Sequence, residues 1–290
     1  MLQDLRHFVL ISRPVNVLIS VLAFALSCYL ALGKTFDFWM HEGFWGTALT
    51  IALVAATGYW INDVYDFRID RVNRPGRTIV NALLSVKKVL TVYFIVTAGI
   101  LLFSLGFLGY RNGLYHVSFI NVLSVLLLFW YAAHLKRVSV AGNLVVSFLT
   151  ALVLFLPVYI YPPGHLAPIW AVIFAFEITL IREITKDVED IRGDLTYHLR
   201  TLPILIGINN TRRILYVLYG VFVASCWLPL STERWENRAA YIVASLLLVQ
   251  LPTLYLVRLL ARASEPEDFG RQSRYLKWLM LTGMATLFFL

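Results

Sequence analysis

The segment from Phe44 to Asp70 reads FWGTALTIALVAATGYWI followed by NDVYDFRID, so an apolar run passes directly into a cluster of acids. About 20 apolar residues are enough for a helix to cross a bilayer. A second apolar run, 166–184, leads in the same way into Asp187-Val188-Glu189-Asp190-Ile191-Arg192-Gly193-Asp194. Charge beside a membrane is costly unless a partner compensates it. Both clusters therefore need a positive partner.

The composition indicates an integral membrane protein. Of the 290 residues, 59% are hydrophobic and only 14% are charged, and the mean hydropathy is +0.73. A soluble domain carries roughly 25% charged residues. The start of the chain, Met1–His7, runs into Arg13-Pro14 and a span too long for a signal peptide. We expect an all-α, polytopic membrane bundle formed by one domain over residues 1–290.

Apolar runs of spanning length recur along the chain and predict about nine transmembrane helices. The predicted spans are 14–32, 44–62, 87–108, 114–133, 141–161, 166–184, 212–230, 239–260 and 274–290. A faint internal repeat is visible, because Asp66 and Asp70 recur 124 positions later as Asp190 and Asp194. Two matched aspartates can reflect a repeat of helical units or chance.

The basic residues predict the orientation. With the N-terminus in the cytoplasm, 21 of the 25 Lys and Arg residues fall on the cytoplasmic side, as the positive-inside rule requires. The other side keeps Lys34, Arg111, Arg234 and Arg238. The net charge of +8 is thus explained by topology, and we expect no nucleic acid partner. Both acidic clusters are predicted to be cytoplasmic, in a bacterial or archaeal plasma membrane.

The acids are not scattered at random, because nine of the seventeen lie in two short stretches. Helical spacing i, i+4, i+8 places Asn62, Asp66 and Asp70 on one face. Spacing i, i+3, i+7 does the same for a second triplet, Asp187, Asp190 and Asp194. Stacked like charges repel unless a cation lies between them, and Mg²⁺ is commonly held by one or two carboxylates plus substrate phosphates. The bland alternative is a pair of solvated helix ends with ordinary surface acids.

Basic residues interleave with the acids. Arg guanidinium groups match phosphate oxygens, and Lys supplies a point charge. We predict that Arg182 and Lys186, inside the second cluster, bind a diphosphate, and we count Arg77 and Asp63 among the substrate-binding residues. A role in topology is the alternative. Two such clusters at span ends point to an enzyme that acts on a phosphorylated lipid.

These motifs resemble those of the UbiA superfamily of intramembrane prenyltransferases. The first signature is Asn62-Asp63-x-x-Asp66-x-x-x-Asp70, followed by Arg71-x-Asn73-Arg74-Pro75. The second is Arg182-Glu183-x-x-Lys186-Asp187-x-Glu189-Asp190-x-x-Gly193-Asp194. Their order, separation and the predicted helices agree with the family over nearly the full chain.

The resemblance implies an all-helical bundle around a central cavity. It also implies Mg²⁺-dependent transfer of a prenyl group from a prenyl diphosphate to a lipid-soluble acceptor, among membrane lipids. It implies that Asp66, Asp70, Asp190 and Asp194 are catalytic. One Mg²⁺ would be bound by Asn62, Asp66 and Asp70, and another by Asp187, Asp190 and Asp194. Arg13-Pro14 with Asn16 resembles the first-helix signature, and Tyr131 with Lys136 resembles a fourth-helix motif that borders the cavity. Asn16, Tyr131 and Lys136 are thus expected to bind substrate.

The exact form of the second motif indicates the acceptor. The form Arg-Glu-x-x-Lys-Asp-x-Glu-Asp resembles most the branch that prenylates geranylgeranylglyceryl phosphate. An aromatic quinone precursor is the alternative acceptor, and a cation-coupled transporter is the alternative from another class. The chain departs from the family at His198, where a glycine is usual, and at Thr78–Asn81, which replace a Pro-Ile-Pro-Ser pattern.

Overall fold

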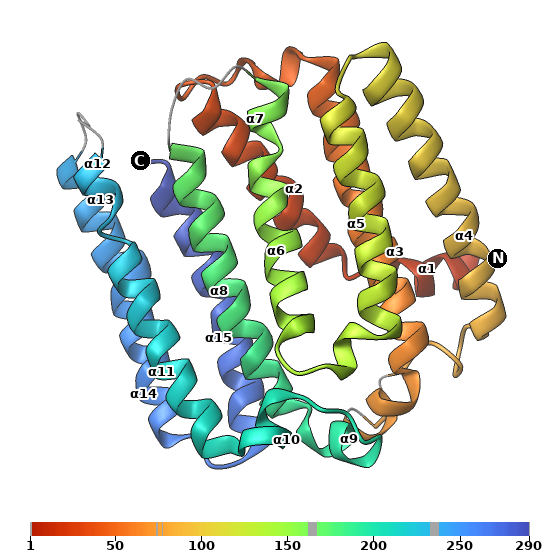
Figure 1. Ribbon diagram of the computed structural model, residues 1–290, viewed down its shortest axis with the longest axis vertical. Coiled ribbons are helices and arrows are strands. Elements are labelled where there is room, and N and C mark those ends of the chain that lie inside the picture. The colour runs from red at the N-terminus through yellow and green to blue at the C-terminus, as the bar shows by residue number, and fades with distance from the viewer. Residues whose placement is uncertain (1, 74, 77, 162–166, 233–237, 290) are drawn as a thin grey trace. The chain divides into compact units, whose positions relative to one another are not determined.

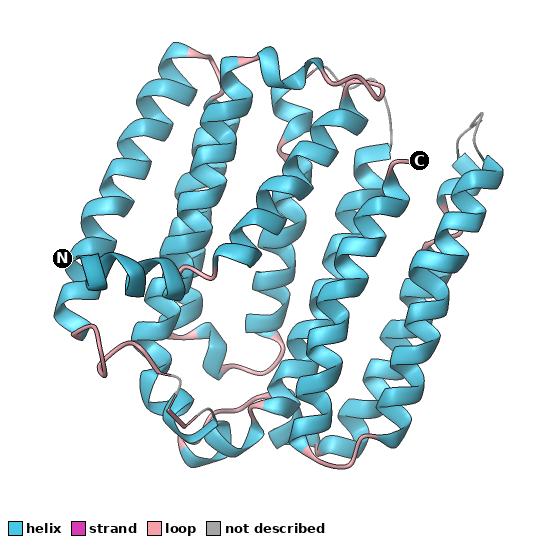
Figure 2. Ribbon diagram, turned by 180° about the vertical axis from the view of Figure 1, so that it is seen from behind, coloured by secondary structure: helices cyan, strands magenta, loops and turns pink. Residues whose placement is uncertain are grey.

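The computed structural model describes residues 2–73, 75–76, 78–161, 167–232 and 238–289. Within these residues the regular structure is helical, and the only β feature described is an isolated bridge between Val80 and Leu84 (Figure 2). The prediction of an all-α fold is therefore confirmed. Contacts divide the chain into two compact units, Met1–Lys136 with Leu156–Gly164 and Arg137–Phe155 with His165–Leu290. That residues 1–290 form one domain stays a prediction.

Most of the chain is helical, and short turns and loops join many successive helices (Figure 1). The first unit contains α1 (Leu2–Ile11), α2 (Pro14–Ala31), η1 (Asp37–Met40), α3 (Glu42–Asn73), α4 (Val86–Phe103), η2 (Ser104–Arg111), α5 (Tyr115–Ala133) and α7 (Pro157–Ile160). The short helix η3 (Leu135–Arg137) spans the point in the sequence where the chain passes from the first unit to the second. The second unit contains α6 (Ala141–Phe155), α8 (Ala167–Glu189), α9 (Ile191–Thr196), α10 (Leu202–Ile206), α11 (Ile208–Ser225), α12 (Pro229–Thr232), α13 (Arg238–Ser245), η4 (Leu246–Gln250), α14 (Leu251–Arg262) and α15 (Pro266–Leu287).

Seven of the described helical segments are long and apolar enough to cross a membrane. They match seven of the predicted spans, although α3 runs well beyond residue 62. The other two predicted spans coincide with α8 and α15, which carry more charge. The protein is thus a multi-pass membrane helical bundle, and the count of nine spans stays a prediction.

In the first unit, α3 packs against α1, α2, α4 and α5. Its apolar face buries Trp60, Ile61 and Val64 against α1 and α4. Helix α1 runs across its neighbours rather than parallel to them (Figure 2). It is anchored to α3 by Trp60, whose Nε1–H donates to the Ser12 hydroxyl over 2.8 Å.

A second anchor joins α1 to α4. The Lys88 ammonium donates to the Asp4 carboxylate over 2.6 Å, and this hydrogen bond holds the pKa of Asp4 below its ordinary value. The N-terminal segment is therefore held to two helices at the level where α4 begins.

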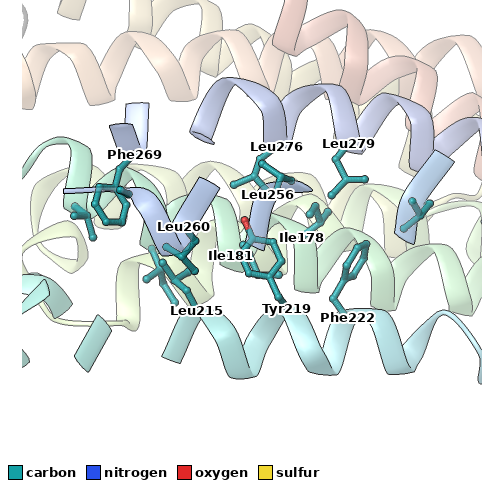
Figure 3. Packing of buried hydrophobic residues seen from close by; sticks show 14 of the residues in the cluster. Ile178, Ile181, Leu215, Tyr219, Phe222, Leu256, Leu260, Phe269, Leu276 and Leu279 are labelled. Carbon is teal, nitrogen blue, oxygen red and sulfur yellow. The ribbon is translucent and has the colours of Figure 1, made fainter. Parts of the chain in front are cut away.

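In the second unit, α8 packs against α6, α11 and α15. Buried side chains from α8, α11, α14 and α15 interdigitate in one apolar cluster (Figure 3). On α8, Ile181, Ile184 and Val188 are almost fully buried and share one helical face, because residues three and four apart lie above one another. This packing sets the rotation of α8 and so determines which directions its polar residues can take.

Close approach of α3 and α5 depends on Gly58. A Cβ atom at Gly58 would lie 2.9 Å from Leu128 Cδ1, whereas one at Gly99 of α4 would meet nothing within 4 Å. Small residues let membrane helices pack closely. We expect Gly58→Val to lower the unfolding free energy in detergent by about 1–3 kcal/mol, through overpacking.

The matched control is Gly99→Val, which makes the same change on an exposed helical position. Thermal unfolding of both purified variants in the same detergent measures the difference. Equal losses in the two variants would contradict the packing explanation.

Candidate active site

The first acidic cluster lies on the last turns of α3. Between Gly58 and Pro75 the chain has no Gly or Pro, and the residue that precedes a proline is disfavoured in the helical conformation. Helix α3 accordingly ends at Asn73. The predicted helical relation of Asn62, Asp66 and Asp70 is therefore confirmed.

Asp66 is the buried centre of this cluster, with 3% of its surface exposed. The Asn62 side-chain amide donates to Asp66 Oδ2 over 2.6 Å. The Lys136 ammonium, which follows α5 and lies 70 residues away in sequence, contacts the same oxygen. One carboxylate thus joins α3 to η3, and Lys136 lies beside the first cluster.

Asp63 has a different partner. Arg13 Nη2 donates to Asp63 Oδ1 over 2.7 Å, and the guanidinium lies 4.7 Å from the centre of the Tyr59 ring. Arg13 has a left-handed backbone, φ 51°, between α1 and α2. Sequence reasoning quoted Arg13 as part of a signature without assigning it a contact. The signal was a cation before Pro14 at the start of an apolar span.

The second acidic cluster follows a different course from the one predicted. Helix α8 ends at Glu189, and Asp190, with φ −92° and ψ 7°, separates it from the short helix α9. Placing Asp187, Asp190 and Asp194 on one face of a continuous helix is therefore wrong. The backbone N–H groups of Asp190 and Asp194 still donate to the carbonyl groups four residues before them, so the departure from helical geometry is confined to Asp190.

An amide also holds the second cluster. Asn143 Nδ2 of α6 donates to Asp187 Oδ2 over 2.8 Å, as the Asn62 amide does for Asp66 in the first cluster. Sequence reasoning missed Asn143. The only sign of it in the sequence is an amide side chain near the start of an otherwise apolar segment.

One turn earlier on α8, the Glu183 carboxylate forms ion pairs with two cationic side chains. Arg182 Nη1 lies 2.7 Å from Glu183 Oε1, and Lys186 Nζ lies 3.3 Å from Glu183 Oε2. Glu189, by contrast, lies against α15, because a Cβ at Gly270 would be 2.9 Å from its Oε1. The basic residues of the second motif thus gather around Glu183.

The remaining predicted site residues are placed as follows. Asp194 is buried on α9, Asn16 lies in the first turn of α2, and Tyr131 lies in the last turn of α5. Arg77 lies outside the described residues. His198, the departure from the family pattern, has φ 54°, a left-handed conformation that glycine adopts without strain. The histidine therefore keeps a backbone shape that suits the family's glycine.

The donor chemistry of both clusters suits Mg²⁺. The side chains are carboxylates with neighbouring amides, and Mg²⁺ prefers oxygen ligands and completes its shell with waters and substrate phosphates. Among the described residues, no three His, Cys, Asp or Glu side chains converge on a common metal position. A metal bound here would therefore take part of its coordination from a substrate.

Comparison with known proteins places this geometry in a family. A family model described as the UbiA prenyltransferase family matches residues 17–281. The chain belongs to the UbiA prenyltransferase family. It is therefore an enzyme of the prenyltransferase class, and the transporter alternative is set aside.

Relatives in the family carry a common name. A digeranylgeranylglyceryl phosphate synthase from Metallosphaera sedula is 40% identical over 63% of each chain, so more than a third of that relative is unmatched. One from Methanothermobacter thermautotrophicus is 32% identical over 97% of this chain and 93% of the relative.

Solved structures agree on the fold. A structure from work on digeranylgeranylglyceryl phosphate synthase in membranes has a TM-score of 0.71 at 22% identity, covering 99% of this chain and 98% of that one. A UbiA homologue from Archaeoglobus fulgidus bound to GPP and Mg²⁺ has a TM-score of 0.67 at 17% identity, covering 97% and 99%.

The pairing of Lys136 with Asp66 predicts a non-additive pair of substitutions. Removing one partner of a buried ion pair costs about 3–5 kcal/mol, because a buried charge is left uncompensated. Since Lys136 is 27% exposed, we expect Lys136→Met to sit at or below the low end of that range. Adding Asp66→Asn to this variant should restore most of the lost stability.

Thermal unfolding of both single variants and the double variant gives the coupling directly. Losses that simply add would show that the two side chains do not stabilise one another.

Proposed function

We propose that this protein transfers a prenyl group from a prenyl diphosphate to geranylgeranylglyceryl phosphate in a Mg²⁺-dependent reaction. The observation that carries the proposal is the presence of two aspartate clusters, each with an amide donating to one carboxylate. The names of the relatives support the choice of acceptor. An aromatic quinone precursor is the acceptor to test against it.

In the proposed reaction the chain binds, orients and excludes water. Mg²⁺, when bound, would neutralise the diphosphate and make it a better leaving group. One Mg²⁺ would be held by Asn62, Asp66 and Asp70, and another by Asp187, Asp190 and Asp194.

The amides of Asn62 and Asn143 orient the carboxylates they contact, which preorganises the charge that meets the leaving group. As the bond between C1 of the prenyl chain and the diphosphate oxygen breaks, the electron pair leaves with the diphosphate. The acceptor hydroxyl attacks C1 and loses its proton to a base. Apolar helices around the site would exclude the water that otherwise captures C1.

Asp190 gives the sharpest test of the proposed reaction. It lies at the junction of α8 and α9, so a substitution there disturbs the packing less than one at the buried Asp66. We expect Asp190→Asn to lower diphosphate release by about 100-fold or more, as loss of preorganised charge stabilisation does. Raising the Mg²⁺ concentration should recover part of the rate.

The assay supplies purified protein with Mg²⁺ and labelled geranylgeranyl diphosphate, and identifies the products by mass. It compares geranylgeranylglyceryl phosphate with aromatic acceptors. Near-normal turnover by the Asp190 variant would sink the metal assignment, and transfer to aromatic acceptors alone would sink the proposed acceptor.

We also propose that the N-terminus and both acidic clusters face the cytoplasm of a bacterial or archaeal cell. The support is the charge distribution, since 21 of 25 Lys and Arg residues fall on that side under the predicted spans.

The native cysteines make this orientation testable. Cys28 and Cys226 are both buried, so an introduced surface cysteine dominates labelling. We expect Ser264→Cys to react with a membrane-impermeant maleimide only in inside-out vesicles, because residue 264 is exposed on the predicted cytoplasmic side. Thr35→Cys should react only in right-side-out vesicles. The reverse pattern would invert the topology.

A further inference from the structure

Three charged residues of α8, Arg182, Glu183 and Lys186, form one compact cluster. The Glu183 carboxylate is buried, with 8% of the residue exposed. Each of its oxygens takes one cation, Arg182 through Nη1 and Lys186 through Nζ. We call these three residues the Arg182–Lys186 cluster. Two cations thus share a single carboxylate, which brings the guanidinium and the ammonium close together.

This cluster differs in charge from the ion pairs of the first unit. There, Lys136 contacts Asp66 and Arg13 contacts Asp63, one cation to one acid. Here two cations contact one carboxylate, and Asp187 directly follows Lys186 on α8. Two closely spaced cations offer several charged donors to an anion.

The guanidinium of Arg182 has one buried N–H group, at Nε, that lacks a hydrogen-bond acceptor among the described residues. Arg182 Nε is buried, and no hydrogen-bond partner for it exists in the part of the chain that the structure describes. A buried donor without an acceptor is unfavourable. Since Nε and a neighbouring Nη present a fork that matches two phosphate oxygens, a phosphate group would satisfy the orphaned donor.

The position of Arg182 on α8 distinguishes two phosphate groups of the reaction. Arg182 lies five residues before Asp187, about 7.5 Å along a helix, whereas Lys186 directly precedes Asp187. The metal-bound diphosphate belongs with the aspartates at the end of α8. A phosphate that no metal holds needs cations that contact it directly, and the Arg182–Lys186 cluster offers them.

The sequence pattern assigned Arg182 and Lys186 to a diphosphate. We propose that they bind the phosphate monoester of the prenyl acceptor instead, and that Glu183 is the positioning residue that holds the two cations in place. This rests on the proposed function, since it concerns the acceptor of that reaction. The cluster then acts as a selectivity element. An acceptor without a phosphate leaves Arg182 Nε unpaired, whereas one with a phosphate satisfies it.

The experiment is a thermodynamic cycle that removes the Arg182 guanidinium and the acceptor phosphate, separately and together. Transfer by the wild type and by Arg182→Gln is measured with geranylgeranylglyceryl phosphate and with the same lipid lacking its phosphate. We expect the substitution to lower kcat/KM about 10- to 100-fold for the phosphate-bearing acceptor, the range for a lost hydrogen bond to a charged group. For the lipid without phosphate, and for the KM of the prenyl diphosphate, little should change.

The positioning role of Glu183 is tested by measuring the KM for the acceptor, because a purely structural role would change stability instead. Glu183→Gln should raise the KM for the phosphate-bearing acceptor, and Glu183→Asp should restore part of it. The matched control is Glu177→Gln, which removes another carboxylate of α8, one that accepts a hydrogen bond from Ser225 in the helix interface. An equal loss of kcat/KM for both acceptors, or a raised KM for the prenyl diphosphate, would overturn the proposal.

A binding measurement separates this proposal from the proposed function. Stabilisation of the wild type and of Arg182→Gln by geranylgeranylglyceryl phosphate is measured by thermal shift without Mg²⁺ or diphosphate. Weaker stabilisation of the variant supports the phosphate site even if the wild type transfers only to aromatic acceptors. Equal stabilisation overturns the site even if the proposed transfer occurs.

Discussion

The ion pair between Lys136 and Asp66 is the contact on which the first unit's site depends. Asp66 is almost fully buried, and a buried carboxylate is tolerated only when a cation and hydrogen-bond donors compensate it. Lys136 supplies the charge from the segment after α5, and Asn62 supplies a donor from the preceding turn of α3. The acid therefore dictates where η3 meets α3.

The second unit meets the same constraint with different residues. An amide from α6, Asn143, contacts Asp187 in place of a lysine. The cations of this unit gather around Glu183 instead. Asp66 and Asp63 thus each contact one cation, whereas Glu183 contacts two.

The spacing of residues along the sequence predicted part of the candidate site. The i, i+4 spacing of Asn62, Asp66 and Asp70 implied a shared helical face, and α3 does run unbroken through all three. The same reasoning was wrong at Asp190, where spacing alone carries no sign that α8 ends and α9 begins. At His198 the sequence showed only a departure from a glycine, and the backbone angle of 54° supplies its meaning.

The sequence by itself determined that the chain is all-helical, membrane-spanning and equipped with two oxygen-rich acidic motifs, because hydropathy and helical periodicity are local properties. Only the tertiary structure decided which donor meets which acid. The partners in Lys136–Asp66, Arg13–Asp63 and Asn143–Asp187 lie 70, 50 and 44 residues apart. Their meeting depends on how neighbouring helices rotate and pack, and that is set by apolar residues such as Ile181 and Val188 rather than by the motifs themselves.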